Sequence, residues 1–326
     1  MSWHPTAPEK KVRDALAVHG RKLKETRPCE WQAELRNGRP FQVRARVQGQ
    51  WLTLDANPDD NGKKADPWQI LLEARGLGNE AQAFMDPRTG ELGIRAEILL
   101  QEEVDLSERV GVACSALVQA VAHLVKPGAP PGEPPPISPG SMGARLGSIL
   151  SGDGWVWEER DDGSLSVALN EPEGGRCRLT LGSNEGLLLR TELTKGPSGS
   201  TQQRRAMATF LLTGTGLVRL VQGYANPDGE EDRVGLGIVL HSDPSPPELT
   251  HGLSALSLAT HHLRHTAGAL LEPAVAERYL QIRVSETKTT GAKSSGGPKG
   301  KGEEKGRPKR RSTVETACTP SRGGKG

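Results

Sequence analysis

The chain has 326 residues, 34% hydrophobic but only 3% aromatic, so it can form two domains whose cores are built from aliphatic side chains. Its four cysteines include no CxxC pair, which argues against a structural metal site and a disulfide framework. No apolar run follows Met1 or approaches the length of a membrane span, so we expect a cytoplasmic protein without membrane contact.

The charge is unevenly distributed along the chain. The net charge is +2, but the residues from 281 onward carry 12 lysines and arginines against 4 acidic residues, which leaves −6 for the rest. The segment 281–326 is also rich in Gly, Ser and Thr and poor in apolar residues, so we expect a disordered basic tail. An acidic body with a basic tail suggests different partners for the two parts.

Hydrophobic periodicity predicts the elements of the first half in chain order. Alternating apolar residues flank the dipeptide Asn37-Gly38, which accepts the positive φ angles of a type I′ hairpin turn. The predicted order is a helix, three strands, a helix, two strands and a helix, at 8–26, 31–35, 41–47, 51–55, 67–74, 80–85, 92–100 and 105–125.

A segment with seven prolines, 126–140, predicts a stiff linker before the second half of the chain. The second half repeats the pattern with one strand more before its middle helix. Helices are predicted at 142–150, 202–212, 246–268 and 273–280, and strands at 155–159, 165–169, 177–181, 186–193, 217–225 and 234–240. The predicted division is 1–126, a linker 127–140, a second unit 141–280 and the tail 281–326.

Two sequence matches support a tandem duplication. SALVQAVAHL at 115–124 and SALSLATHHL at 254–263 share six of ten residues at an offset of 139. Upstream, at an offset of 140, Gln82, Phe84, Asp86 and Pro87 correspond to Gln222, Tyr224, Asn226 and Pro227. Chance similarity in an Ala/Leu-rich chain is the alternative. The duplication predicts an α+β fold of two tandem repeats, each an antiparallel sheet with helices.

Histidines on the last long predicted helix are the strongest candidates for metal chemistry: His251, His261, His262 and His265. His261 and His265 have the spacing of metal ligands, but no HExxH motif with its general-base Glu is present. All four fall opposite the leucine stripe, so a solvated polar face is the first interpretation and adventitious zinc or nickel binding the second. No nucleophile–base or metal set emerges, and we expect neither enzymatic activity nor a cofactor.

Two further features are candidates for binding. Trp155 and Trp157 point to the same side of a predicted strand, either toward a partner or under a helix. A basic cluster lies in the tail, at Lys305, Arg307, Lys309, Arg310 and Arg311. It either binds nucleic-acid phosphates weakly and without sequence specificity, or solubilises and loosely anchors the protein.

The order of predicted elements from 8 to 125, in an acidic unit of about 125 residues, resembles the type III secretion chaperone-like fold, including the YbjN-like family. That resemblance implies small acidic bacterial homodimers that hold extended segments of partner proteins without nucleotide. Two fused units would then pack as an intramolecular pseudo-dimer. The linker, the extra strand and the basic tail depart from this pattern.

We therefore expect a non-enzymatic protein-binding module, a chaperone or adaptor that holds an extended segment of a partner protein. The candidate contact residues are the apolar side chains Trp51, Leu52, Leu54, Trp155, Trp157 and Leu258. The alternative is a nucleic-acid-associated protein tethered by its basic tail.

Overall fold

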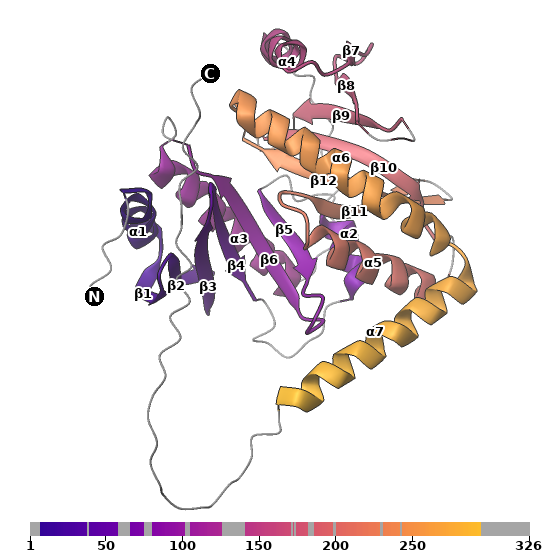
Figure 1. Ribbon diagram of the computed structural model, residues 1–326, viewed down its shortest axis with the longest axis horizontal. Helices are drawn as coiled ribbons and strands as arrows, with labels where there is room; N and C mark the ends of the chain where they lie inside the picture. The colour runs from indigo at the N-terminus through magenta and orange to yellow at the C-terminus, as the bar shows by residue number, and fades with distance from the viewer. Residues whose placement is uncertain are drawn as a thin grey trace, which may run out of the picture.

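A computed structural model describes residues 7–37, 39–57, 66–74, 80–101, 105–125, 141–170, 172, 174–181, 186–197, 200–228, 231–241 and 243–294. These residues form a mixed α+β structure with two antiparallel sheets of six strands each (Figure 1). The predicted fold class is confirmed. None of the helices in this part of the chain is both long and apolar enough to cross a membrane.

The first repeat is built around a sheet with the strand order β1-β2-β3-β4-β6-β5. Its elements in chain order are α1 (Ala7–His19), β1 (Arg21–Arg27), β2 (Glu30–Asn37), β3 (Arg39–Gln48), β4 (Trp51–Ala56), α2 (Pro67–Ala74), β5 (Ala81–Met85), β6 (Leu92–Leu99) and α3 (Leu106–Val125). Helix α3 begins after Asp105, whose Oδ1 accepts a hydrogen bond from the Ser107 backbone N–H (2.9 Å). The helices α1 and α3 pack on each other and on this sheet.

The second repeat has the same topology, with the strand order β7-β8-β9-β10-β12-β11. Its elements are α4 (Ser141–Gly152), β7 (Trp157–Glu159), β8 (Leu165–Ala168), β9 (Arg176–Leu181), β10 (Leu187–Lys195), α5 (Thr201–Thr215), β11 (Gln222–Asp228), β12 (Glu231–Leu240), α6 (Pro246–Ala269) and α7 (Pro273–Ser294). Each element from α4 to α6 has a counterpart from α1 to α3, which supports a tandem duplication.

The prediction of one helix over 8–26 is wrong. Helix α1 ends at His19, where the Gly20 N–H donates to the Leu16 carbonyl, and Lys22 adopts a φ of +53°. The chain then continues as β1, antiparallel to β2. Because most of β1 is exposed, it carries no apolar alternation that would reveal a strand. Both repeats therefore have four strands before the middle helix. The second repeat does not have the extra strand that the sequence predicted for it.

Two boundaries in the second half differ most from the prediction. The strand expected over 217–225 begins only at Gln222, because 216–220 form turns in which Leu220 has a φ of +65°. The prediction starts the disordered tail at 281, but 281 lies inside α7, which continues to Ser294. The linker 127–140, Gly38 of the predicted hairpin turn and 295–326 lie outside the described residues.

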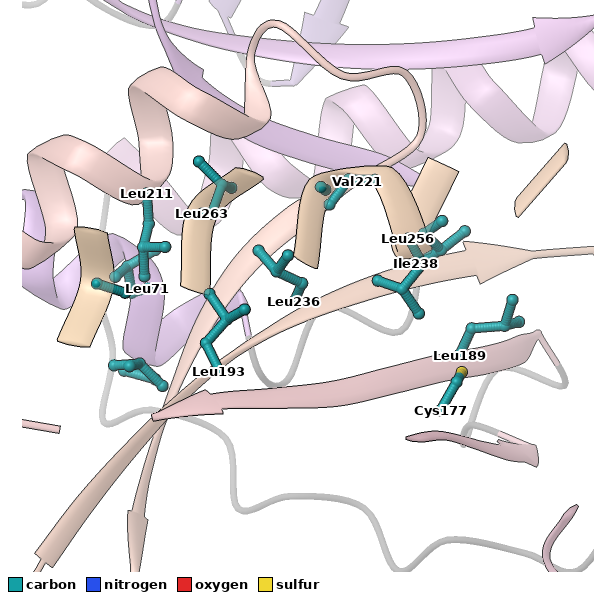
Figure 2. Packing of buried hydrophobic residues seen from close by; sticks show 14 of the residues in the cluster. Leu71, Cys177, Leu189, Leu193, Leu211, Val221, Leu236, Ile238, Leu256 and Leu263 are labelled. Atoms are coloured by element: carbon teal, nitrogen blue, oxygen red, sulfur yellow. The ribbon is translucent and has the colours of Figure 1, made fainter. Parts of the chain in front are cut away.

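The middle helices cross the boundary between the repeats. Helix α2 of the first repeat packs on β11 and α5 of the second, and α5 packs on β5 of the first. Strands β5 and β11 are therefore close together at the boundary, which we call the seam (Figure 1). Leu71 of α2 joins Leu211 of α5 in the core of the second repeat (Figure 2). Helix α2 therefore contributes to the core of the second repeat, whereas the core described for the first repeat contains residues of the first repeat alone.

Candidate binding site

Two of the predicted partner contacts are core residues. Leu52 and Leu54 are fully buried in the core of the first repeat, together with Leu117 of α3. Side chains alternate along β4, so these leucines face α3 while Trp51 and Thr53 face the other side of the sheet. Leu52 and Leu54 are therefore inaccessible to a partner, which corrects their prediction as contact residues.

Trp51 lies at the seam. Its ring is 5.9 Å from the ring of His251 on α6, in an edge-on arrangement. The Arg219 guanidinium, from the turn between α5 and β11, lies 5.5 Å from the Trp51 ring centroid. Trp51 of the first repeat therefore contacts two residues of the second.

The tryptophans of the second repeat pack under a helix. Trp157 donates from Nε1 to Ser151 Oγ (3.0 Å), and its ring lies so close to Gly147 of α4 that a Cβ there would be 2.7 Å away. Trp155 packs against the same core. Of the predicted apolar contacts, Leu258 is the most accessible, with 52% of its surface exposed.

The four histidines of α6 are exposed, as expected for a solvated polar face. His261 and His265 have no third ligand, since no group of three or more His, Cys, Asp or Glu side chains in the described part of the chain can hold a metal ion. The tail cations Lys305, Arg307, Lys309, Arg310 and Arg311 lie outside the described residues.

The outer face of the first sheet, opposite its helices, holds a turn segment of the second repeat, residues 216–220. Glu97 of β6 accepts hydrogen bonds from the Leu220 backbone N–H (2.6 Å) and from Arg219 Nη1 (3.0 Å). Arg95 Nη1 donates to the Gly216 carbonyl (3.2 Å). One buried carboxylate and one arginine thus bind both the backbone and a side chain of a non-helical segment.

Both repeats place an aromatic ring over a glycine on this outer face. Phe84 of β5 pairs with Gly93 of β6, and Tyr224 of β11 pairs with Gly235 of β12. A Cβ at Gly93 would lie 2.4 Å from the Phe84 ring, and one at Gly235 would lie 2.6 Å from the Tyr224 ring. An arginine stacks on each ring, Arg95 at 4.4 Å and Arg190 at 5.4 Å. The two sheets therefore share the aromatic-over-glycine pair, while the stacking arginine comes from β6 in the first and from β10 in the second.

The outer face of the second sheet forms a groove of about 620 Å³, which we call the arginine groove. Its side chains come from β8 to β11, from Arg160 between β7 and β8, and from Arg264 of α6. The polar lining residues are Arg160, Ser166, Arg176, Arg178, Thr180, Arg190, Thr191, Glu192, Tyr224, Asn226 and Arg264. Five arginines and one glutamate give this lining a net charge of +4, opposite in sign to the body of the chain.

Hydroxyl and carboxyl groups position the two arginines of β9. Arg176 donates from Nε to Ser166 Oγ (2.8 Å) and pairs with Glu158 (2.7 Å). Arg178 donates from Nε to Ser164 Oγ (3.1 Å) and pairs with Asp162. Hydrogen bonds from Ser164 lower the pKa of Asp162, and Arg178 lowers it further, so Asp162 is ionised. Both guanidinium side chains remain over 40% exposed and accessible to a ligand.

A buried polar cluster at the seam is the second candidate site. Arg109 of α3 lies 2.8 Å from Glu248 of α6 and 3.6 Å from Glu80. Burial raises the pKa of Glu80 to about 7; Arg109 opposes the rise and Glu248 adds to it. Burial and Arg109 both lower the pKa of His241, which lines the same cavity.

The cavity in this seam cluster is small, about 30 Å³, which is enough for one water molecule. Gln82 and Gln222 line it, and the buried amide oxygen of each has no hydrogen-bond partner among the described residues. These two residues are the equivalent positions found in the sequence match. The cluster is suited to joining the repeats and too small for a polypeptide or nucleotide.

Sequence reasoning missed both the groove and the seam cluster. The groove's arginines are contributed by separate strands, and only the alternation of Arg176 and Arg178 in RCRLTL carries a local signal. No protein-family model matches this chain, and no curated protein sequence matches it.

Proposed function

We propose that this chain is a non-enzymatic binding module, a chaperone or adaptor that holds an extended segment of a partner protein on the outer face of a sheet. One observation carries the proposal: the outer face of the first sheet already holds residues 216–220 of the same chain. The contacts are those that a partner segment would need, with a carboxylate for backbone N–H groups and an arginine for carbonyls.

The duplication extends this argument to the second sheet. Its outer face has the same topology and the same aromatic-over-glycine packing. It presents a groove whose volume is large enough for several side chains. Gly235 and Gly237 of β12 carry no side chains, so the Tyr224 ring covers this part of the face. We assign the holding of a partner segment to this second face.

The seam supports a rigid scaffold for such binding. Residues of α2, β5 and β6 belong to the core of the second repeat, so the two sheets are packed together through that core. The described cysteines Cys29, Cys114 and Cys177 form no disulfide with one another, as in a reducing compartment, and we propose a cytoplasmic location.

Hydrogen exchange of the full chain tests the proposal. A permanently unfolded polypeptide of mixed composition is added in excess, and a folded protein of similar size serves as the control. We expect added protection in β9, β10 and β11 with the unfolded polypeptide alone. Protection in no strand at saturating polypeptide, or equal protection by the folded control, would contradict segment holding.

A further inference from the structure

We infer that the segment bound in the arginine groove is acidic, with carboxylates at alternate positions of an extended polypeptide. This inference rests on the proposed function and names its substrate class. The groove lining carries five arginines and one glutamate, whereas the body of the chain has a net charge of −6. A localised basic face favours an anionic partner.

The register of the sheet places two of these arginines side by side. Arg178 of β9 pairs directly with Arg190 of β10 in the antiparallel ladder. Directly opposed like charges destabilise a sheet, and a carboxylate bound between the two guanidinium groups would offset their repulsion, as Asp162 does at Arg178 in the free protein. Arg190 also stacks on Tyr224, which holds its guanidinium over the groove. The pair is therefore a preformed site for a carboxylate.

The spacing along β9 matches an extended peptide. Arg176 and Arg178 are two residues apart on one face of a strand, so their Cα atoms are separated by about 6.6 Å. Acidic residues at positions i and i+2 of an extended segment have the same separation. Alternate carboxylates of one segment can thus meet successive arginines.

The existing partners of these arginines are replaceable. Glu158 and Asp162 are themselves exposed, at 58% and 49% of their side-chain surface. Exposed ion pairs contribute little to stability, so a partner carboxylate can take their place at small cost. They hold the guanidinium groups in position in the free protein.

The groove favours a polypeptide over a nucleic acid. Tyr224 is the one aromatic residue of its lining, it is 8% exposed, and Arg190 lies over its ring. No ring in the lining is thus open for base stacking, on which single-strand binding depends. Glu192 lies in the groove and Glu158 and Asp162 beside it, where they oppose a continuous phosphodiester chain but leave room for spaced carboxylates.

Peptide binding to the full chain tests the inference. Three short fluorescent peptides alternate threonine with glutamate, serine or lysine, and a short oligothymidine is the fourth probe. The groove variant Arg176→Gln with Arg178→Gln is compared with Arg44→Gln and Arg46→Gln on β3, the equivalent strand of the first repeat. We expect the glutamate peptide to bind wild type tightest and about tenfold more weakly to the groove variant, with little change in the β3 variant.

Each other outcome has one meaning. Equal affinity of the glutamate and serine peptides, or equal loss in both variants, contradicts the acidic specificity while segment holding stands. Binding of none of the three peptides contradicts segment holding itself. Tighter binding of oligothymidine, lost in the groove variant, reassigns the groove to nucleic acid and overturns the inference. If the double variant unfolds, Arg160→Gln, which changes an exposed lining residue between β7 and β8, replaces it.

Discussion

Arg109 and Glu248 occupy the same position of the two repeats and form an ion pair with each other across the seam. They are 139 residues apart, the offset that relates the helix copies, and Arg109 Nη2 lies 2.8 Å from Glu248 Oε1. In a symmetric dimer of one repeat, this contact would join two like charges. Fusion into one chain allows the two positions to differ, so the seam can carry a complementary pair that a homodimer cannot.

The Arg109–Glu248 pair predicts a large effect of a single substitution. Arg109→Gln leaves Glu248 and Glu80 without their shared cation in a site where each side chain is nearly buried. We expect the free energy of unfolding to fall by about 3–4 kcal/mol in urea denaturation. Arg233→Gln, which removes an exposed pair with Glu192, is the control and should cost less than about 1 kcal/mol. Equal losses would show that the seam pair is no stronger than a surface one.

The raised pKa of Glu80 predicts a pH dependence of stability. Its pKa rises from an ordinary 4.5 to about 7, so between these values the folded protein binds more protons than the unfolded chain. The free energy of unfolding should therefore fall as the pH rises from 4.5 to 7, by on the order of 2–3 kcal/mol, and level off above. Denaturation at a series of pH values measures this.

Glu80→Gln is the matched variant for that experiment. It keeps the shape of the side chain and removes the titration, so its stability should change less over the same pH range. An unchanged pH profile in this variant would assign the dependence to another group.

The equivalent helices predict equal roles for their central leucines. Leu117 and Leu256 are fully buried, and truncation of either to Ala should lower the free energy of unfolding by about 2–5 kcal/mol. Leu258→Gln should be nearly neutral, because Leu258 is half exposed and the first repeat has Gln119 at this position. A loss as large as that of Leu256→Ala would contradict the offset of 139, and a loss of partner binding alone would place Leu258 in a binding surface.

Because the histidines of α6 are exposed, we expect their substitution to leave stability and binding unchanged. Replacing His261 and His265 together with Gln should leave both thermal stability and peptide binding unchanged, since both side chains are exposed on α6. Metal analysis of the purified protein provides the check. Stoichiometric zinc in wild type that disappears in the double variant would show a metal site on this helix.

The amino-acid sequence by itself determined the duplication and most of the elements. Helix α2 at 67–74 and the strands around the Asn37-Gly38 dipeptide follow from local periodicity and turn chemistry, which need no knowledge of distant contacts. Strand β1 was not predicted, because an exposed edge strand has no apolar alternation. Only its pairing with β2 defines it as a strand.

Tertiary structure alone decided which surfaces are available. Leu52 and Leu54 alternate as on any half-buried strand, and only the packing of α3 shows that their side faces the core. Arg178 and Arg190 meet because strand register aligns them, and Arg109 of α3 meets Glu248 of α6 because the two repeats pack together at the seam. Such contacts join residues that no local pattern relates, so the arginine groove and the seam cluster become visible only once the two sheets are folded and packed.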